Sequence, residues 1–387
     1  MAAFPSPPPP KSALGRHRLL APNASVRVSP LCLGGMSLGD KWGGFLGECT
    51  KERAFELLDT FYDLGGNFID TANNYHNGQS ERWIGEWLRE TGRRQEMVIA
   101  TKYTASPRMG ESGQGSNFGG AGSKSMHIAI RESLERLQTD YVDLYFVHVY
   151  DFATGIPELM QSLNHLVQQG KVLYLGISDT PAWVVVKANA YARQHGLRPF
   201  SVYQGHYSVQ LRDLERDVIP MCRDEGMAVH AWGVLGRGYF STPGSDEKKE
   251  GGRNTAIGRT GREERVCEVL NNVAQRHGVP LTSVALAYAL QKTPQMFPII
   301  GGRKVEHLKA NIEALTLELT PEDIKEIETG YEFDVGFPHN FTNPDRFAAL
   351  GPEHMGVLRW LGYFDYVAQP QAIKPHKGDL GAQWKAP

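Results

Sequence analysis

One pattern recurs eight times between residues 31 and 331: a short apolar run that ends in polar or glycine residues, followed by a stretch with helical periodicity. Apolar runs of this length predict buried strands, and the periodic stretches predict helices that pack against them. The expected strands are residues 31–34, 67–70, 97–101, 142–147, 172–178, 201–207, 228–232 and 296–300. Eight strands that each precede a helix predict a (β/α)8 TIM barrel of the α/β class.

The alternative α/β architecture is a doubly wound open sheet, which would need the sequence G-x-G-x-x-G after its first strand. Residues 33–37 read Leu-Gly-Gly-Met-Ser and do not fit this motif. Hydroxyl side chains favour helix starts, so Thr50 and Ser80 are predicted N-caps. Residues 211–225 are predicted to form one continuous helix, as the barrel repeat requires.

The barrel is expected to occupy residues 15–336, with a hairpin at its start whose strands, 17–20 and 25–29, flank a Pro-Asn turn. Residues 1–14 are rich in proline and serine and predict a disordered tail. Residues 337–387 lack the strand–helix alternation. They predict an irregular C-terminal extension that packs in part over the barrel mouth, among long mouth loops.

Composition excludes several classes of function. The formal net charge is -2 for 387 residues, which gives no argument for nucleic acid or an anionic membrane as a partner. Cys32, Cys49, Cys222 and Cys267 lie far apart, so neither a disulfide framework nor a metal site is predicted. No apolar run is long enough to span a bilayer, and the proline-rich start does not fit a secretory signal. A cytoplasmic protein is therefore expected.

Four ionisable side chains lie at or just after the carboxyl ends of three neighbouring predicted strands. They are Asp70 and Tyr75 after the second strand, Lys102 after the third and His148 after the fourth. In a barrel these strand ends converge on one mouth. Each residue alone also fits an ordinary structural role, such as a turn cap or a core imidazole. Their coincidence at neighbouring strand ends favours one site.

The chemistry that these residues suggest is proton donation by a phenol. Tyrosine, with a pKa of about 10, is a poor acid at neutral pH, but a nearby ammonium group is expected to lower that pKa. Asp70 would keep Lys102 charged and in place, and His148 would hydrogen-bond a substrate carbonyl oxygen. Tyr75 would then protonate that oxygen as hydride reaches the carbon. None of these residues can supply hydride, so a nicotinamide cofactor is implied.

At these positions the chain resembles an aldo-keto reductase. Residues 67–72 with Tyr75, residues 99–102 and residues 143–148 are similar to the segments that carry the Asp/Tyr/Lys/His tetrad of that superfamily. Residues 167–183, 201–205 and 300–309 resemble the fungal aryl-alcohol dehydrogenase and norsolorinic acid reductase group in particular. The resemblance implies a TIM barrel, NADP(H) as cofactor and a small-molecule carbonyl or alcohol as substrate.

The resemblance also implies roles for residues that would hold the cofactor. Ser178, Asp179 and Gln204 match the positions that bind the nicotinamide carboxamide, and Trp232 the position of the aromatic ring that stacks on the nicotinamide. The predicted adenosine end consists of Gly301, Gly302, Arg303, Lys304, His307 and Asn311. Glycines, a helix start and cations suit the adenosine 2′-phosphate, so NADPH is preferred over NADH.

Aromatic residues near predicted strand ends suggest the substrate. The candidates for the pocket are Trp42, Tyr103, Tyr150 and Tyr207, with Phe45, Phe152 and Phe240 nearby. A mouth of this kind favours a bulky apolar or aromatic carbonyl, such as an aryl aldehyde or a secondary-metabolite intermediate. Two other functions stay open: a non-redox isomerase or dehydratase that uses the same acid–base groups, and a cofactor-sensing regulatory subunit.

Overall fold

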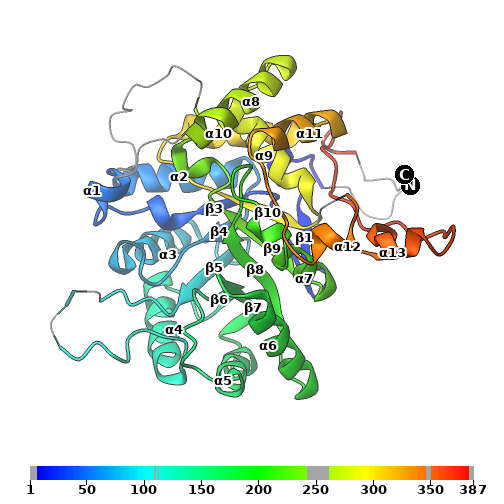
Figure 1. Ribbon diagram of the computed structural model, residues 1–387. Helices are drawn as coiled ribbons and strands as arrows, with labels where there is room; N and C mark the ends of the chain where they lie inside the picture. Colours follow the sequence, from blue (N-terminus) through cyan, green and yellow to red (C-terminus); the bar gives the residue numbers. More distant parts are fainter. Residues whose placement is uncertain (1–6, 109, 112, 242–260, 346–349, 383–387) are drawn as a thin grey trace, which may run out of the picture.

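The computed structural model describes residues 7–108, 110–111, 113–241, 261–345 and 350–382. Eight parallel strands close into a barrel in the order β10-β3-β4-β5-β6-β7-β8-β9 (Figure 1). Their bounds are β3 (Cys32–Gly34), β4 (Phe68–Asp70), β5 (Val98–Tyr103), β6 (Val142–Val147), β7 (Val172–Ser178), β8 (Phe200–His206), β9 (Ala228–Trp232) and β10 (Met296–Ile300). The predicted (β/α)8 barrel is confirmed.

Helices surround the barrel, and their apolar faces pack on the outside of the strands (Figure 1). The principal ones are α2 (Lys51–Asp63), α3 (Gln79–Thr91), α4 (Ser123–Leu137), α5 (Ile156–Gln168), α6 (Ala182–Gln194), α7 (Val218–Asp224), α8 (Gly261–His277), α9 (Leu281–Lys292), α10 (Val305–Glu313) and α11 (Pro321–Thr329). The predicted N-cap Thr50 begins α2, where its side chain accepts a hydrogen bond from the backbone of Arg53.

A hairpin of β1 (Arg18–Ala21) and β2 (Ala24–Val28) closes the amino-terminal end of the barrel. Asn23 and Asn67 anchor it, since Asn23 donates to the carbonyl of Phe200 at the start of β8 and Asn67 donates to the carbonyl of Arg27. Apolar side chains of the hairpin share one buried cluster with the barrel interior. The opposite end, where the strands finish, is therefore the open one.

Two helix predictions were wrong in detail. Ser80 does not cap α3; it lies buried in the first turn, and its hydroxyl donates to the carbonyl of Gly35. Gly78 is the N-cap, with a φ of 82° that suits glycine. The helix predicted over residues 211–225 is a 3-10 turn followed by the shorter α7, because Pro220 is tolerated only in the first turn of a helix.

The two ends of the described chain meet at the closed end of the barrel. Leu14 is fully buried in a 3-10 turn (Ala13–Gly15), so the predicted disordered tail does not extend over residues 12–14, and residues 1–6 lie outside the described residues. Arg16 donates to the carbonyls of Leu380 and Ala382 at 2.6 and 3.0 Å. These contacts place that part of the extension away from the mouth that it was expected to cover.

Helices α3 and α4 approach so closely at Gly85 that no side chain fits between them. A Cβ at Gly85 would lie 2.7 Å from the Leu137 Cα, which is backbone and cannot turn aside. We therefore expect Gly85→Ala to lower the free energy of unfolding by about 1–3 kcal/mol, as over-packing does. Urea denaturation measures this change. Gly261→Ala, where a Cβ meets open space, is the matched control, and equal stability of the two variants would contradict the prediction.

Candidate active site

The predicted tetrad residues meet at the open end of the barrel. Asp70 is the last residue of β4, Lys102 the last but one of β5, and His148 follows β6 directly. Neighbouring registers bring them together, because Asp70 pairs with Ala100 and Lys102 with Phe146. Tyr75 begins the 3-10 turn that follows β4, and its ring lies edge-on to His148 with centroids 6.0 Å apart.

A buried ion pair between Lys102 and Asp70 is the centre of this group. Lys102 Nζ lies 2.6 Å from Asp70 Oδ2, and neither residue is more than 2 % exposed. The ammonium also donates to the carbonyl of Thr71 at 2.7 Å and to the hydroxyl of Tyr75 at 3.3 Å. These three bonds use all three protons of the ammonium group and fix it next to the phenol.

Burial and charge act in opposite directions on these groups. Burial alone would lower the pKa of Lys102, but the negative charge of Asp70 and the hydrogen bonds outweigh it, and the net pKa is raised. Burial raises the pKa of Tyr75, and the nearby Lys102 offsets this only in part. From the sequence we expected the pKa of Tyr75 to be lowered. The pKa is raised instead because desolvation outweighs the charge of Lys102, and Tyr75 therefore holds its proton at neutral pH.

His148 is neutral at physiological pH. Burial, together with the positive charge of Lys102, lowers its pKa to about 3. Its Nδ1 atom is buried and has no hydrogen-bond partner among the residues that the structure describes. A neutral imidazole carries one N–H donor and one acceptor, so His148 can donate a hydrogen bond to an oxygen placed beside Tyr75.

Gln204 joins the tetrad to the barrel wall. Its Nε2 donates to Asp70 Oδ1 at 2.9 Å and lies 3.1 Å from Nδ1 of His230, a buried histidine of β9. Ser178 pairs with Gln204 across β7 and β8. The hydroxyl of Ser178 is close enough to the Asp179 carboxylate to favour its charge, yet makes no aligned hydrogen bond. A buried hydroxyl beside an amide fits a nicotinamide carboxamide.

Trp232 ends β9 and is held from two sides. Its indole Nε1 donates to Asp179 Oδ1 at 3.3 Å. One face of the indole stacks on His206, with centroids 4.1 Å apart and an interplanar angle of 11°. Asp179 therefore contacts the edge of the indole, and the indole face away from His206 is the one that a nicotinamide ring could cover.

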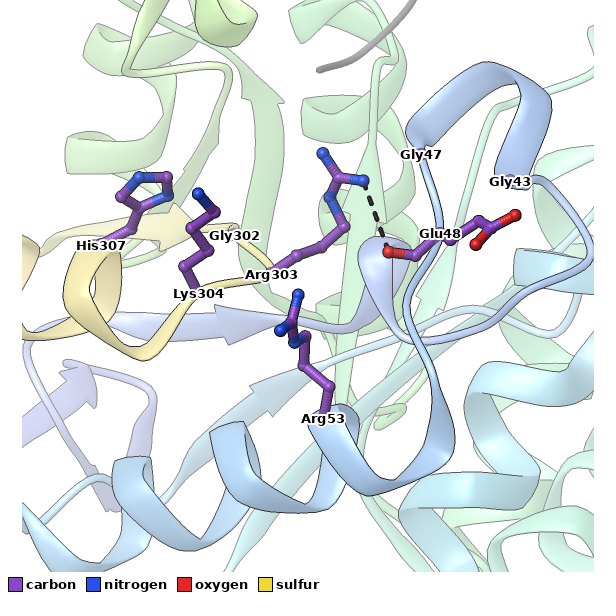
Figure 2. Close-up of a pocket in the computed structure, with 8 residues that line it drawn as sticks. All are labelled: Gly43, Gly47, Glu48, Arg53, Gly302, Arg303, Lys304 and His307. Atoms are coloured by element: carbon purple, nitrogen blue, oxygen red, sulfur yellow. Dashed lines mark hydrogen bonds between the residues drawn. The ribbon is translucent and has the colours of Figure 1, made fainter. Parts of the chain in front are cut away.

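A cationic pocket of about 490 Å³ lies between the end of β10 and the loop before α2 (Figure 2). It is lined by Gly43, Gly47, Glu48, Arg53, Gly302, Arg303, Lys304 and His307. In Figure 2 the side chains of Arg53 and Arg303 both lie at this pocket, although they come from different elements. Arg303 also reaches across to the carbonyl of Glu48 at 3.5 Å.

Arg53 was not among the cofactor-binding residues predicted from the sequence. It lies in the first turn of α2, about 250 positions from Arg303, and only the closure of the barrel brings the two together. The predicted Gly301 and Asn311 line a narrow cavity beside the pocket, together with Leu57 and Leu308, and Asn311 is 5 % exposed. The group of cations in the neighbouring pocket suits a phosphate.

The predicted substrate residues separate into two groups. Trp42 lies edge-on to Tyr75 with ring centroids 6.2 Å apart, and the half-buried Tyr150 packs against the exposed Phe152. Tyr103 and Tyr207 are fully buried, and their hydroxyls donate to the Ala121 carbonyl and to Glu215. The structure thus places Tyr103 and Tyr207 in the core rather than on the wall of a substrate pocket. Phe240 is also buried, and Phe45 is exposed.

His76 positions Trp42. His76 was not among the site residues predicted from the sequence. The backbone N–H of Trp42 donates to His76 Nδ1 at 3.1 Å, and His76 Nε2 lies 3.0 Å from the Met36 carbonyl. The indole also stacks on the imidazole, with centroids 5.1 Å apart. In the sequence, the only indication of this role was that a histidine directly follows Tyr75.

Comparison with known proteins agrees with this geometry. The sequence pattern of the Aldo/keto reductase family matches residues 30–332. The chain belongs to the aldo/keto reductase family. The resemblance predicted from the sequence is confirmed, and this aldo/keto reductase is an oxidoreductase.

Several curated relatives cover nearly the whole chain. An aryl-alcohol dehydrogenase of Pestalotiopsis microspora is 64 % identical over 383 residues, 98 % of each chain. Norsolorinic acid reductase A of Aspergillus parasiticus is 54 % identical over 339 residues, 87 % of each chain. An aryl-alcohol dehydrogenase [NADP(+)] of Phanerodontia chrysosporium is 46 % identical over 387 residues, 96 % of this chain and 99 % of the relative.

Within the described ranges, no group of three or more His, Cys, Asp or Glu side chains could hold a metal ion. Of the helices that the structure describes, none is both long enough and apolar enough to cross a membrane.

The buried His230 gives a prediction for stability. Burial lowers its pKa to about 4, whereas an unfolded histidine has a pKa of about 6.5. Between these values the unfolded chain binds the additional proton, so His230 makes stability fall as the pH drops from 7 to 5. We expect this fall to be smaller in His230→Asn by up to about 2 kcal/mol. Urea titrations at both pH values measure it, and an equal fall in both proteins would contradict it.

Proposed function

We propose that this aldo/keto reductase reduces an aldehyde or ketone with NADPH, with Tyr75 as the general acid. The observation that carries the proposal is the chain of short contacts from Asp70 to Lys102 and from Lys102 to the Tyr75 hydroxyl. It holds a protonated phenol and a fixed positive charge at the open end of the barrel. That combination supports proton transfer to an oxygen that becomes negative during reaction.

A nicotinamide held by Ser178, Gln204 and Trp232 would supply a hydride to the carbonyl carbon. Tyr75 gives its proton to the carbonyl oxygen, and the O–H bond of the phenol breaks as the new O–H bond of the alcohol forms. Lys102 stabilises the phenolate that remains, because its ammonium lies 3.3 Å away. His148 donates a hydrogen bond to the same carbonyl oxygen and orients it. Alcohol oxidation follows the same steps in reverse.

The structure offers groups for each end of the cofactor. Ser178 and Gln204 would hold the carboxamide, and Trp232 would cover one face of the nicotinamide ring. Arg303, Lys304 and Arg53 would surround the adenosine 2′-phosphate, with His307 at the same pocket. Three permanent cations at one pocket favour a phosphate over the hydroxyl that NADH carries there. The name of the Phanerodontia chrysosporium relative supports the same cofactor.

The substrate is proposed to be a bulky, aromatic carbonyl of secondary metabolism. Trp42 lies edge-on to Tyr75, and Tyr150 and Phe152, which pack against each other, follow soon after His148 in the chain. The names of the relatives, aryl-alcohol dehydrogenase and norsolorinic acid reductase, support an aromatic substrate. An isomerase or dehydratase would turn over substrate without net loss of NADPH, and a regulatory subunit would bind NADPH without turnover.

Replacement of Tyr75 by Phe tests the general acid. We expect Tyr75→Phe to lower kcat for aryl aldehyde reduction by about 10²–10⁴-fold, because the variant has no proton to give. Loss of NADPH absorbance with a panel of benzaldehydes measures kcat, and NADPH fluorescence titration should give a nearly unchanged Kd. Near-normal turnover by the variant would refute the assignment.

Replacement of the pocket cations tests the preference for NADPH. We expect Arg303→Ala and Arg53→Ala each to weaken NADPH binding about tenfold or more, since each removes a charged hydrogen bond, while the Kd for NADH changes little. Fluorescence titration with both cofactors measures the ratio. Arg89→Ala, an exposed arginine of α3 outside the pocket, is the control. Equal losses for NADPH and NADH would show that the pocket does not bind the 2′-phosphate.

A further inference from the structure

We infer that His230 is a positioning residue: it accepts a hydrogen bond from Gln204 and so turns the Gln204 amide oxygen toward the carboxamide of the cofactor. This inference rests on the proposed use of NADP(H). His230 lies on β9, next to Gln204 of β8 in the register of the barrel, and it is fully buried. It would not itself touch a reacting atom.

The imidazole of His230 is fixed by aromatic packing. It stacks on Phe68 with centroids 4.8 Å apart and an interplanar angle of 9°, and Phe146 lies 6.1 Å away on a tilted plane. Both phenyl rings belong to the barrel interior below the tetrad. This packing sets the plane of the imidazole, and its Nδ1 atom lies 3.1 Å from Gln204 Nε2.

The direction of the hydrogen bonds follows from Asp70. Its carboxylate, which is paired with Lys102, can only accept, so the atom of Gln204 at 2.9 Å from Asp70 Oδ1 has to be the NH₂ group. The second N–H of that group points at His230 Nδ1, which must then accept. The proton of the neutral imidazole is consequently on Nε2, and the buried ring stays uncharged at neutral pH.

The consequence for the cofactor is a fixed hydrogen-bonding pattern. Both N–H donors of Gln204 are used inside the protein, and only its Oε1 is left to meet a ligand, as an acceptor. Ser178, the register partner of Gln204, offers a buried hydroxyl that can donate. One acceptor beside one donor is complementary to a primary amide. Without His230 the Gln204 amide would lose one of the two contacts that determine its orientation.

Two substitutions separate positioning from packing. His230→Asn keeps a polar acceptor near the Nδ1 position, whereas His230→Leu keeps apolar volume and removes the acceptor. If His230 only packs against Phe68, His230→Leu should retain the cofactor preference of the wild-type enzyme better than His230→Asn. If His230 positions Gln204, His230→Asn should retain that preference better. Thermal denaturation of both variants provides the check that they fold.

Binding of a cofactor analogue gives the readout. The 3-acetylpyridine analogue of NADP⁺ has a methyl group in place of the carboxamide NH₂, so it cannot donate to Gln204. We expect the wild-type enzyme and His230→Asn to bind NADP⁺ about 2–12-fold more tightly than the analogue, and His230→Leu to bind both equally. Tryptophan fluorescence titration measures the Kd values. A preference retained in His230→Leu would overturn the inference.

The unliganded wild-type protein provides a second test. Nitrogen-15 NMR of histidine-labelled protein reports which ring nitrogen carries the proton, and the signal of His230 is the one that His230→Asn lacks. We expect a neutral ring protonated on Nε2 at pH 7, and a proton on Nδ1 would overturn the inference. If the wild-type enzyme binds no NADP⁺, the proposed function fails. If it binds NADP⁺ without preference over the analogue, the role of His230 alone fails.

Discussion

The buried ion pair of Lys102 and Asp70 is the interaction on which the rest of the site depends. Two opposite charges without solvent contact are tolerated only when every remaining lone pair and proton has a partner. Here the Thr71 carbonyl and Tyr75 satisfy the ammonium, and Gln204 satisfies the second carboxylate oxygen. The same bonds that make the ion pair tolerable thus orient the phenol and the amide. The contacts that stabilise the ion pair are therefore the same ones that position the proposed reacting groups.

Much of this arrangement could be predicted from the sequence. Apolar runs with polar ends gave the eight strands, and the geometry of a parallel barrel then required Asp70, Lys102 and His148 to converge. The same geometry brings Ser178 and Gln204 into register. The positions of residues at strand ends can be predicted, because the two-residue period of a strand and the closure of the barrel allow few other arrangements of their side chains.

Other features could not be predicted, because they depend on depth and on contacts between distant segments. Tyr103 and Tyr207 follow the same pattern as Tyr150, and nothing local shows that only the first two are fully buried. The net pKa of Tyr75 depends on desolvation, which the sequence does not contain. Arg53 reaches the cationic pocket from another element of the barrel.

The hairpin that closes the amino-terminal end of the barrel has a consequence for the order of events in turnover. With that end filled by apolar side chains, every ligand has to pass through the same opening. A ligand that contacts Gln204 lies next to the barrel interior, whereas one that contacts Trp42 lies nearer the exposed loop. Under the proposed function the cofactor would be the deeper molecule, and it would have to bind before the carbonyl substrate and leave after the product.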